Sequence, residues 1–183
     1  MVAVFAGGGG LALAAMLAGD APKQASISRN SKMVTYAVEN WFDVKDQMAH
    51  LWPLHWEEVA VNRDQIKLDP DFDTYASFAN AGMLHIVVAR KDGEVIGYHF
   101  SIVRPHLHYR QSLSAFTDIY YIAPQYRTGR TPLRLFEFVE KTLKARGVQK
   151  MFTGTKLSLD AGPLFEHMGW TETERLYIKV LGE

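Results

Sequence analysis

The chain has 183 residues, 48% hydrophobic and 22% charged, which is enough to build the core of one domain with an added extension. Its 20 basic and 20 acidic residues cancel, so no bulk attraction to nucleic acid or anionic lipid exists, and any charge-based function needs a local cluster. The absence of cysteine excludes disulfides, thiol nucleophiles and zinc sites built on cysteine, which is compatible with a reducing compartment.

The first 19 residues, MVAVFAGGGGLALAAMLAG, carry no charged side chain. Four consecutive glycines break a helix, so the segment is a poor membrane span, and it lacks the basic stretch that opens a secretory signal. We expect a flexible or partner-docked extension, with membrane or partner insertion and a cleaved signal as the alternatives. The polar residues 20–32 are typical of a linker, which predicts an extension over 1–32 and a folded domain over 33–183.

Strand and helix patterns alternate along the folded domain. The predicted elements are a strand (33–38), a helix (41–61), a short helix (69–82), a β-hairpin (83–103), a strand (112–123), a helix (132–146), a strand (150–156), a short helix (160–169) and a final strand (173–181). We expect Asp43 to cap the first helix, Pro53 to break it in two and Gly82 to close the second. Asp92-Gly93 is strong hairpin-turn chemistry. Hairpins mixed with a few helices favour a single α+β structure.

The stretch APQYRTGRTPLRLFEF, residues 123–138, leads from a strand into an amphipathic helix. Thr131 can cap that helix, and Pro132 suits its first turn because its missing N–H is not needed there. One face of the helix is predicted to pack on a sheet through Leu133, Phe136, Val139 and Leu143.

Positive charge gathers at the start of this helix. Arg127, Arg130 and Arg134 surround the unpaired N–H groups of the first turn, and Gly129 allows a ligand to approach the backbone closely. Three guanidinium groups and the positive end of a helix repel one another without a counter-ion. The spacing therefore favours a phosphate or pyrophosphate ligand, with a solvated basic turn as the alternative.

A strand, Pro-x-Tyr-Arg and an amphipathic helix in this order resemble the acetyl-CoA-binding segment of the GNAT N-acetyltransferases. The later stretches LKARGVQKMFTGT and LFEHMGWTETERLYIKVL resemble that family's following strand, helix and last strand, so the resemblance spans about residues 33–181. More narrowly, HWEE, HLHY, TDIYYIAPQYR and LFEHMGW resemble a subgroup associated with phage and prophage genomes. The resemblance implies a central, mostly antiparallel sheet flanked by helices, with acetyl-CoA held in a V-shaped gap between two strands.

The resemblance also implies a set of coenzyme-binding residues. These are Tyr121, Ile122, Arg127, Thr128, Gly129, Arg130, Thr131 and Arg134. Arg130 and Pro132 stand where the family usually has glycine or alanine, and we interpret the arginines as charge that replaces the N–H lost at Pro132. Phe165 occupies the position of a tyrosine acid found in many relatives, so another group or water must protonate the leaving thiolate.

Asp118 lies six residues before Pro124, where many family members place an acidic general base. The alternative is that Asp118 only hydrogen-bonds a neighbouring strand or loop. Tyr120 shares strand parity with Asp118 and is predicted to line the gap with it, while Tyr121 packs beneath the helix. His108, which follows His106 by two residues, is a candidate proton shuttle. No metal is expected, because no metal-binding motif is complete.

The acceptor is expected to bind against the first helical region. His55 and Glu58 share a helix face, as do Trp52 and Trp56, and an acidic, aromatic lining suits a cationic amine. The alternative is that the tryptophans are core and the glutamates are solvated. The candidate substrate-binding residues are His55, Glu58, Tyr75 and Tyr109.

Two functions follow from these patterns. The first is an N-acetyltransferase of the bacterial cytoplasm that moves the acetyl group of acetyl-CoA to an amine on a small molecule or protein, with a homodimer as one arrangement. The second is a catalytically silent GNAT-fold component of a phage virion, in which residues 1–19 dock on other phage structural proteins or on a membrane. A small-molecule sensor that keeps only the coenzyme pocket is a third option. Sequence-specific binding of nucleic acid is not expected.

Overall fold

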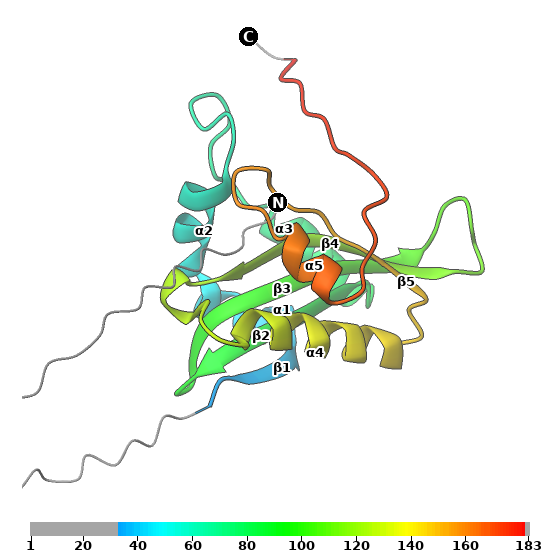
Figure 1. Cartoon of the computed structure of the whole chain (residues 1–183), viewed down its shortest axis with the longest axis horizontal. Helices are drawn as coiled ribbons and strands as arrows, with labels where there is room; N and C mark the ends of the chain where they lie inside the picture. The colour runs from blue at the N-terminus through cyan, green and yellow to red at the C-terminus, as the bar shows by residue number, and fades with distance from the viewer. Residues whose placement is uncertain (1–32, 182–183) are drawn as a thin grey trace, which may run out of the picture.

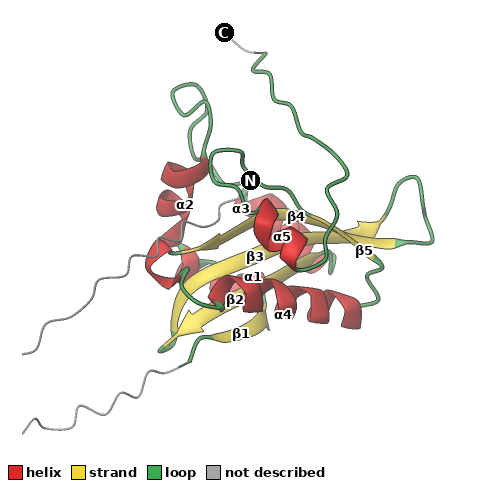
Figure 2. Ribbon diagram, in the orientation of Figure 1, coloured by secondary structure: helices red, strands yellow, loops and turns green. Residues whose placement is uncertain are grey.

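The structure is a computed structural model that describes residues 33–181, so the predicted extension over 1–32 lies outside the described residues. Figures 1 and 2 show the arrangement of its elements. These are β1 (Thr35–Glu39), α1 (Trp41–Val44), the 3-10 turn η1 (Asp46–Met48), α2 (Leu51–Val59), α3 (Phe72–Asn80), β2 (Leu84–Lys91), β3 (Glu94–Pro105), β4 (Leu113–Ile122), the 3-10 turn η2 (Pro124–Tyr126), α4 (Thr131–Ala145), β5 (Lys150–Phe152) and α5 (Gly162–His167).

A five-stranded sheet in the order β1-β2-β3-β4-β5 forms the centre of the fold. The first three pairings are antiparallel and β4 pairs with β5 in parallel, so the connection through α4 is a crossover. The turn between β2 and β3 has positive φ at both Asp92 (54°) and Gly93 (89°), as a type I′ turn requires. The predicted α+β class and hairpin are confirmed.

The two faces of the sheet are covered by different helices (Figure 1). One face packs against α1, α2 and α3 around a cluster that includes Trp41, Leu51 and Phe100. The other packs against α4 and α5. The sheet-facing side of α4 consists of Leu135, Phe136, Val139 and Leu143, so Leu135 replaces the predicted Leu133, which is only half-buried.

The caps of two helices differ from the sequence expectation. Asn40, not Asp43, caps α1, since its Oδ1 accepts a hydrogen bond from the N–H of Phe42 at 2.9 Å. The interruption of the first helical region falls around η1, and Pro53 lies in the first turn of α2, where its missing N–H breaks no helical bond. Thr131 is the first residue of α4 rather than its cap.

The predicted final strand over 173–181 is wrong. Residues 171–181 adopt no regular secondary structure, and the side chains of Leu176 and Tyr177 are 92% and 86% exposed. An alternating sequence pattern becomes a strand only when a neighbouring strand supplies hydrogen bonds, and within the described residues no strand pairs with this segment. None of the helices within residues 33–181 has the length and apolar character needed to cross a membrane.

Candidate active site

The strand β5 is short, so its pairing covers only part of β4. Only residues 114–116 of β4 pair with β5, although β4 continues to Ile122, so residues 117–122 extend past the pairing, and we call this stretch the β4–β5 divergence. Eight residues separate the end of β4 from the start of α4, which lies on the opposite face from α1–α3. The divergence therefore lies between a helix N-terminus on one face and the aromatic core on the other.

A β-bulge places Asp118 at the start of this divergence. Phe100 of β3 pairs with Ile119 and the next residue, Ser101, pairs with Thr117, so Asp118 is the extra residue in β4. The bulge shifts strand parity by one, so Tyr121 now shares the face of Asp118 and Tyr120 points to the other. This corrects the expectation that Asp118 and Tyr120 share a face and that Tyr121 packs beneath the helix.

Asp118 is held by a tyrosine from α3. The hydroxyl of Tyr75 donates a hydrogen bond to Oδ2 of Asp118 at 2.5 Å. Burial, and secondly the charge of Asp118, raise the pKa of Tyr75, so its phenol stays protonated and acts as the donor. Trp41 lies 5.0 Å from the Tyr75 ring and Phe100 lies 5.5 Å from it, centroid to centroid. The carboxylate is therefore fixed by a rigid aromatic neighbour.

Tyr120 lies on the α4 and α5 side of the sheet. Its ring packs edge-on against Phe136 at 5.0 Å and Phe165 at 6.2 Å, and its hydroxyl donates to the carbonyl oxygen of Gly154 at 3.2 Å. This bond joins β4 to the chain just after β5. Burial raises the pKa of the Tyr120 phenol, so the hydroxyl stays protonated. Beside Gly154, Oγ1 of Thr153 is buried and has no hydrogen-bond partner among the described residues, a feature that no local sequence signal indicated.

The structure directs Arg127 away from the start of α4. Its two terminal nitrogens form an ion pair with both carboxylate oxygens of Glu58 on α2, and its Nε donates to the carbonyl of Ile122 at 2.6 Å. The guanidinium also lies 5.2 Å from the ring centroid of Tyr121. With a side chain only 9% exposed, Arg127 ties the loop to α2 instead of standing beside Arg130 and Arg134.

The other residues of the basic loop remain at the helix start. Arg130 is the N-cap of α4 and its side chain, 66% exposed, lies 3.5 Å from Glu137. Gly129 has a φ of 60°, and a Cβ built there would meet no atom within 4 Å, so the space above its backbone is open. Thr128 and Arg134 are exposed, and the carbonyl of Thr131 accepts a hydrogen bond from Tyr36. Open backbone at a helix N-terminus with two exposed arginines fits a diphosphate.

The two predicted acceptor residues on α2 are both engaged within the protein, Glu58 by Arg127 and His55 in the core. His55 is 3% exposed, its Nδ1 lies 2.8 Å from the Tyr98 hydroxyl and its ring stacks on Tyr121 at 4.8 Å. Burial lowers the pKa of His55 to about 3, so the ring is neutral, and its Nε2 has no partner among the described residues. Trp52 belongs to the core and Trp56 is half-buried, so the interpretation of Trp52 as a core residue is confirmed.

The structure does not bring His108 and Tyr109 to Asp118. Both are exposed in the loop between β3 and β4, which the N–H of His106 closes by donating to the carbonyl of Ser112 at 2.9 Å. Asp118 lies five residues beyond the start of β4, and a strand rise of about 3.3 Å per residue separates it from this loop by roughly 16 Å. A proton shuttle by His108 has no geometric support, and residues 33–181 contain no His, Asp and Glu cluster suited to a metal.

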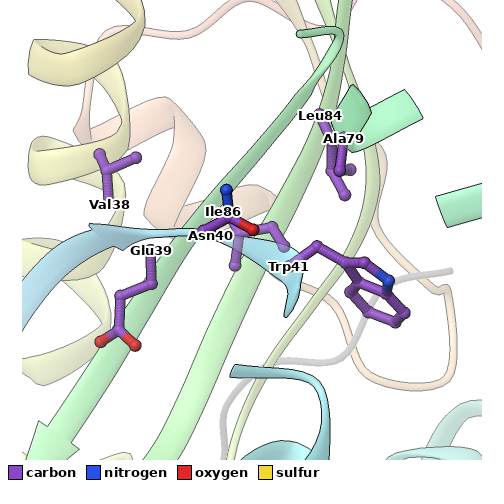
Figure 3. A pocket seen from close by; sticks show the side chains of 7 residues that line it. All are labelled: Val38, Glu39, Asn40, Trp41, Ala79, Leu84 and Ile86. Carbon is purple, nitrogen blue, oxygen red and sulfur yellow. The ribbon is translucent and has the colours of Figure 1, made fainter. Parts of the chain in front are cut away.

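A surface pocket of ≈ 270 Å³ lies at the other edge of the sheet (Figure 3). Its lining residues are Val38, Glu39, Asn40, Trp41, Ala79, Leu84 and Ile86. Glu39 is already engaged, since both of its carboxylate oxygens accept hydrogen bonds from Arg90 at 2.7 Å. Three strands of the sheet order separate β1 from β5, so this pocket is distinct from the β4–β5 divergence.

Comparison with known proteins links this geometry to a fold. No family model and no curated protein matches the sequence. Solved structures do match. A ribosomal-protein-alanine N-acetyltransferase from Brucella melitensis biovar Abortus 2308 superimposes with a TM-score of 0.62 at 17% identity, covering 82% of this chain and 100% of that one.

Two further structures give the same result. Glucosamine-6-phosphate N-acetyltransferase from Arabidopsis thaliana matches with a TM-score of 0.62 at 12% identity over 82% of this chain and 100% of its own. A predicted acetyltransferase from Clostridium acetobutylicum, solved with acetyl-CoA, matches with a TM-score of 0.60 at 13% identity over 81% of this chain and 97% of its own. Together with the sheet order, the matches establish that this protein has the fold of the GNAT acetyltransferases.

Proposed function

We propose that the protein is an N-acetyltransferase that moves an acetyl group from acetyl-CoA to an amine. The observation that carries the proposal is the position of Asp118, on a bulge just beyond the last residue of β4 that pairs with β5. A carboxylate there can take the proton that an amine acceptor loses when it forms an amide. The three proteins compared above are named as acetyltransferases, and their shared fold supports the general activity.

The proposed coenzyme site lies on the α4 side of the divergence. The backbone around Gly129 and the exposed side chains of Arg130 and Arg134 would hold the diphosphate at the N-terminus of α4. The open space at Gly129 fits a ligand that runs from this helix along β4. Acetyl-CoA supplies the acetyl group as a thioester. Arg127 contributes indirectly, because its ion pair with Glu58 fixes the loop.

Each face of the sheet supplies one group for the chemistry. On the α1–α3 side, Asp118 accepts a proton from the acceptor amine, directly or through water, while the Tyr75 hydroxyl holds the carboxylate in position. On the α4 side, the protonated hydroxyl of Tyr120, which donates to the Gly154 carbonyl in the unbound protein, would exchange that bond for one to the departing sulfur. The ring of Tyr120 packs edge-on against that of Phe165, the residue at the position where the family resemblance implies a tyrosine acid.

The experiment that tests the proposal measures coenzyme binding and thiol release together. Acetyl-CoA should raise the melting temperature of the full chain, and free coenzyme A should appear when amines of several classes are supplied: a peptide N-terminus, an aminoglycoside and an amino sugar. Acetyl-pantetheine, which lacks the diphosphate, is the control and should give a much smaller thermal shift. The absence of any shift at millimolar acetyl-CoA would overturn the proposal.

A virion role has no support from the structures named above. The segment on which it depends, residues 1–19, lies outside the described residues. Cytoplasmic location and dimerisation remain predictions of the sequence.

A further inference from the structure

A stack of cations and aromatic rings lies where β4 and β5 are still paired. The rings of Phe116 and Phe152 are parallel, with an angle of 2° and centroids 4.9 Å apart. The guanidinium of Arg104 lies 4.6 Å from the centroid of Phe116, and the ammonium of Lys150 lies 5.7 Å from that of Phe152. The ring of His106 lies 6.0 Å from both. Cation–π contacts of this length attract cationic side chains to the faces of the rings.

This cation–aromatic stack, formed by Arg104, Phe116, Phe152 and Lys150, is on the same face as Asp118. Thr117 points to the α4 side, because its hydroxyl lies 3.3 Å from Nε2 of His99, which packs on Phe136. Neighbouring strand residues point to opposite faces, so Phe116 shares the face of Asp118. Phe116 and Phe152 are half-buried and Lys150 is exposed, and the β3–β4 loop projects beyond the helices in Figure 1.

The distance between the stack and Asp118 follows from the strand register. Phe116 precedes Asp118 by two residues. Arg104 pairs with Ser114, and Ser114 precedes Asp118 by four residues. At about 3.3 Å per residue, the Cα atoms of Phe116 and Ser114 lie about 7 and 13 Å from that of Asp118, which puts the stack on the order of 10 Å from the carboxylate. One small molecule or a few residues of a peptide can span that distance.

Charge along this face is divided. Residues 104–116 contain two arginines and two histidines and no acidic residue, and Lys150 adds a further cation beside them. The α3 side carries Asp71, Asp73 and Asp118. A ligand that places its amine at Asp118 would therefore place its other end among cations. The guanidinium of Arg104 and the ammonium of Lys150 are complementary to an anionic group.

We infer that the acceptor carries a carboxylate or phosphate group on the order of 10 Å from the amine that is acetylated, and that Arg104 and Lys150 bind this group. The inference rests on the proposed acetyltransferase function and names the acceptor class of the same site. The aromatic rings favour positions of the two cations over the ring faces before the acceptor arrives, which lowers the entropy lost on binding.

The experiment compares matched acceptors on the full chain. The first pair is glucosamine and glucosamine-6-phosphate. The second pair consists of two short peptides that differ only at their third and fourth positions, which are glutamate in one peptide and glutamine in the other. Within one pair or both, the anionic member should have a KM at least about tenfold lower than its neutral partner, as expected for charge-assisted hydrogen bonds. Preference within the sugar pair identifies a phosphate, and preference within the peptide pair identifies a carboxylate.

The variant Arg104→Gln/Lys150→Gln should abolish that preference by raising the KM for the anionic acceptor, with kcat and the KM for acetyl-CoA changed less than about twofold. The control Lys141→Gln/Lys144→Gln removes two charges from the exposed side of α4 and should leave the preference intact. Equal KM values within every pair, or a preference that survives the Arg104→Gln/Lys150→Gln change, would overturn the inference.

Failure of the inference can be told apart from failure of the proposed function. If neutral and anionic amines are acetylated with equal KM values, the proposed acetyltransferase function is supported and the anion subsite is ruled out. If no amine is acetylated, binding of glucosamine-6-phosphate is measured by calorimetry: binding that the Arg104→Gln/Lys150→Gln change abolishes supports the subsite without the activity. If no amine is acetylated and glucosamine-6-phosphate does not bind, both the proposed function and the anion subsite are ruled out.

Discussion

Glu58 on α2 and Arg127 at the end of η2 form a bidentate ion pair, although they are 69 positions apart in the sequence. The side chains of the two residues are only 24% and 9% exposed, and the guanidinium also covers the ring of Tyr121. The pair connects α2, against which the sequence predicts the acceptor to bind, with the loop that leads to α4. It therefore sets the position of that loop before any ligand binds.

Loss of this ion pair should reduce stability substantially. Glu58→Gln leaves the largely buried charge of Arg127 without its counter-ion, so we expect the free energy of unfolding to fall by about 2–4 kcal/mol in urea denaturation. The neighbouring Glu57 pairs with Arg63 at 2.7 Å on the surface, with side chains 64% and 46% exposed, and is the matched control. Glu57→Gln should cost less than about 1 kcal/mol. Equal losses for the two variants would show that burial does not distinguish the pairs.

Coenzyme affinity should depend on Arg130 and Arg134. The double change Arg130→Gln/Arg134→Gln removes both exposed cations at the start of α4, so the Kd of acetyl-CoA should rise about 10- to 100-fold in calorimetry. The affinity for acetyl-pantetheine, which has no diphosphate, should not change. Lys141→Gln/Lys144→Gln, toward the other end of the helix, is the charge-matched control. A coenzyme Kd that stays within twofold of the wild-type value in the arginine variant would place the diphosphate elsewhere.

Asp118→Asn should slow acetyl transfer at least about tenfold, because an amide cannot take a proton from the acceptor amine. The change keeps the shape of the side chain, so acetyl-CoA affinity should be unaffected. Asp46→Asn, at a residue whose side chain is 90% exposed in η1, is the control and should retain full kcat. Unchanged turnover in the Asp118 variant would assign Asp118 a purely structural role through Tyr75.

Tyr120→Phe removes the hydrogen bond to the carbonyl of Gly154 across the divergence. We expect the unbound protein to lose about 1 kcal/mol of unfolding free energy, the ordinary value of one such bond. If the hydroxyl also stabilises the departing sulfur, kcat should fall about tenfold while the Kd of acetyl-CoA stays the same or improves. Tyr36→Phe, which removes the bond to the Thr131 carbonyl, controls for the loss of a half-buried tyrosine hydroxyl. A fall in stability without a fall in kcat would remove Tyr120 from the chemistry.

Acid should destabilise the protein through three buried histidines. Burial lowers the pKa of His55 and His99 to about 3 and that of His85 to about 4. The unfolded chain, with ordinary histidines near pKa 6.5, therefore binds more protons than the folded chain below that pH. The fold keeps these rings neutral, so the histidines do not reduce stability above pH 6.5. Stability falls as the pH drops from 6.5 toward 4, because the unfolded chain takes up protons that the folded chain does not.

When the pH is lowered from 8 to 5.5, each of these histidines should reduce the free energy of unfolding by about 1.4 kcal/mol, or roughly 4 kcal/mol together. Urea denaturation at the two pH values measures the loss. His99→Gln should reduce the difference by about a third, since glutamine does not titrate. A free energy of unfolding that is the same at both pH values would mean that the folded protein protonates these rings.

The sequence by itself determined the elements that depend on neighbours along the chain. Asp92-Gly93 forms its turn because those two residues tolerate positive φ, and α4 forms where a proline in its first turn precedes an apolar face. The element order from β1 to α5, the α+β class and the general resemblance to the GNAT fold followed from such local patterns. The basic loop was identified in the same way.

Tertiary structure decided everything that depends on pairing across the sheet. The bulge at Asp118 is a mismatch between β4 and β3, so no pattern within β4 alone could show that Tyr121, not Tyr120, shares its face. The partner of Arg127 lies on another helix, and the predicted strand over 173–181 lacks a neighbour within the described residues. The physical reason is the same in each case: hydrogen bonds and ion pairs between distant segments exist only once the chain has brought those segments together.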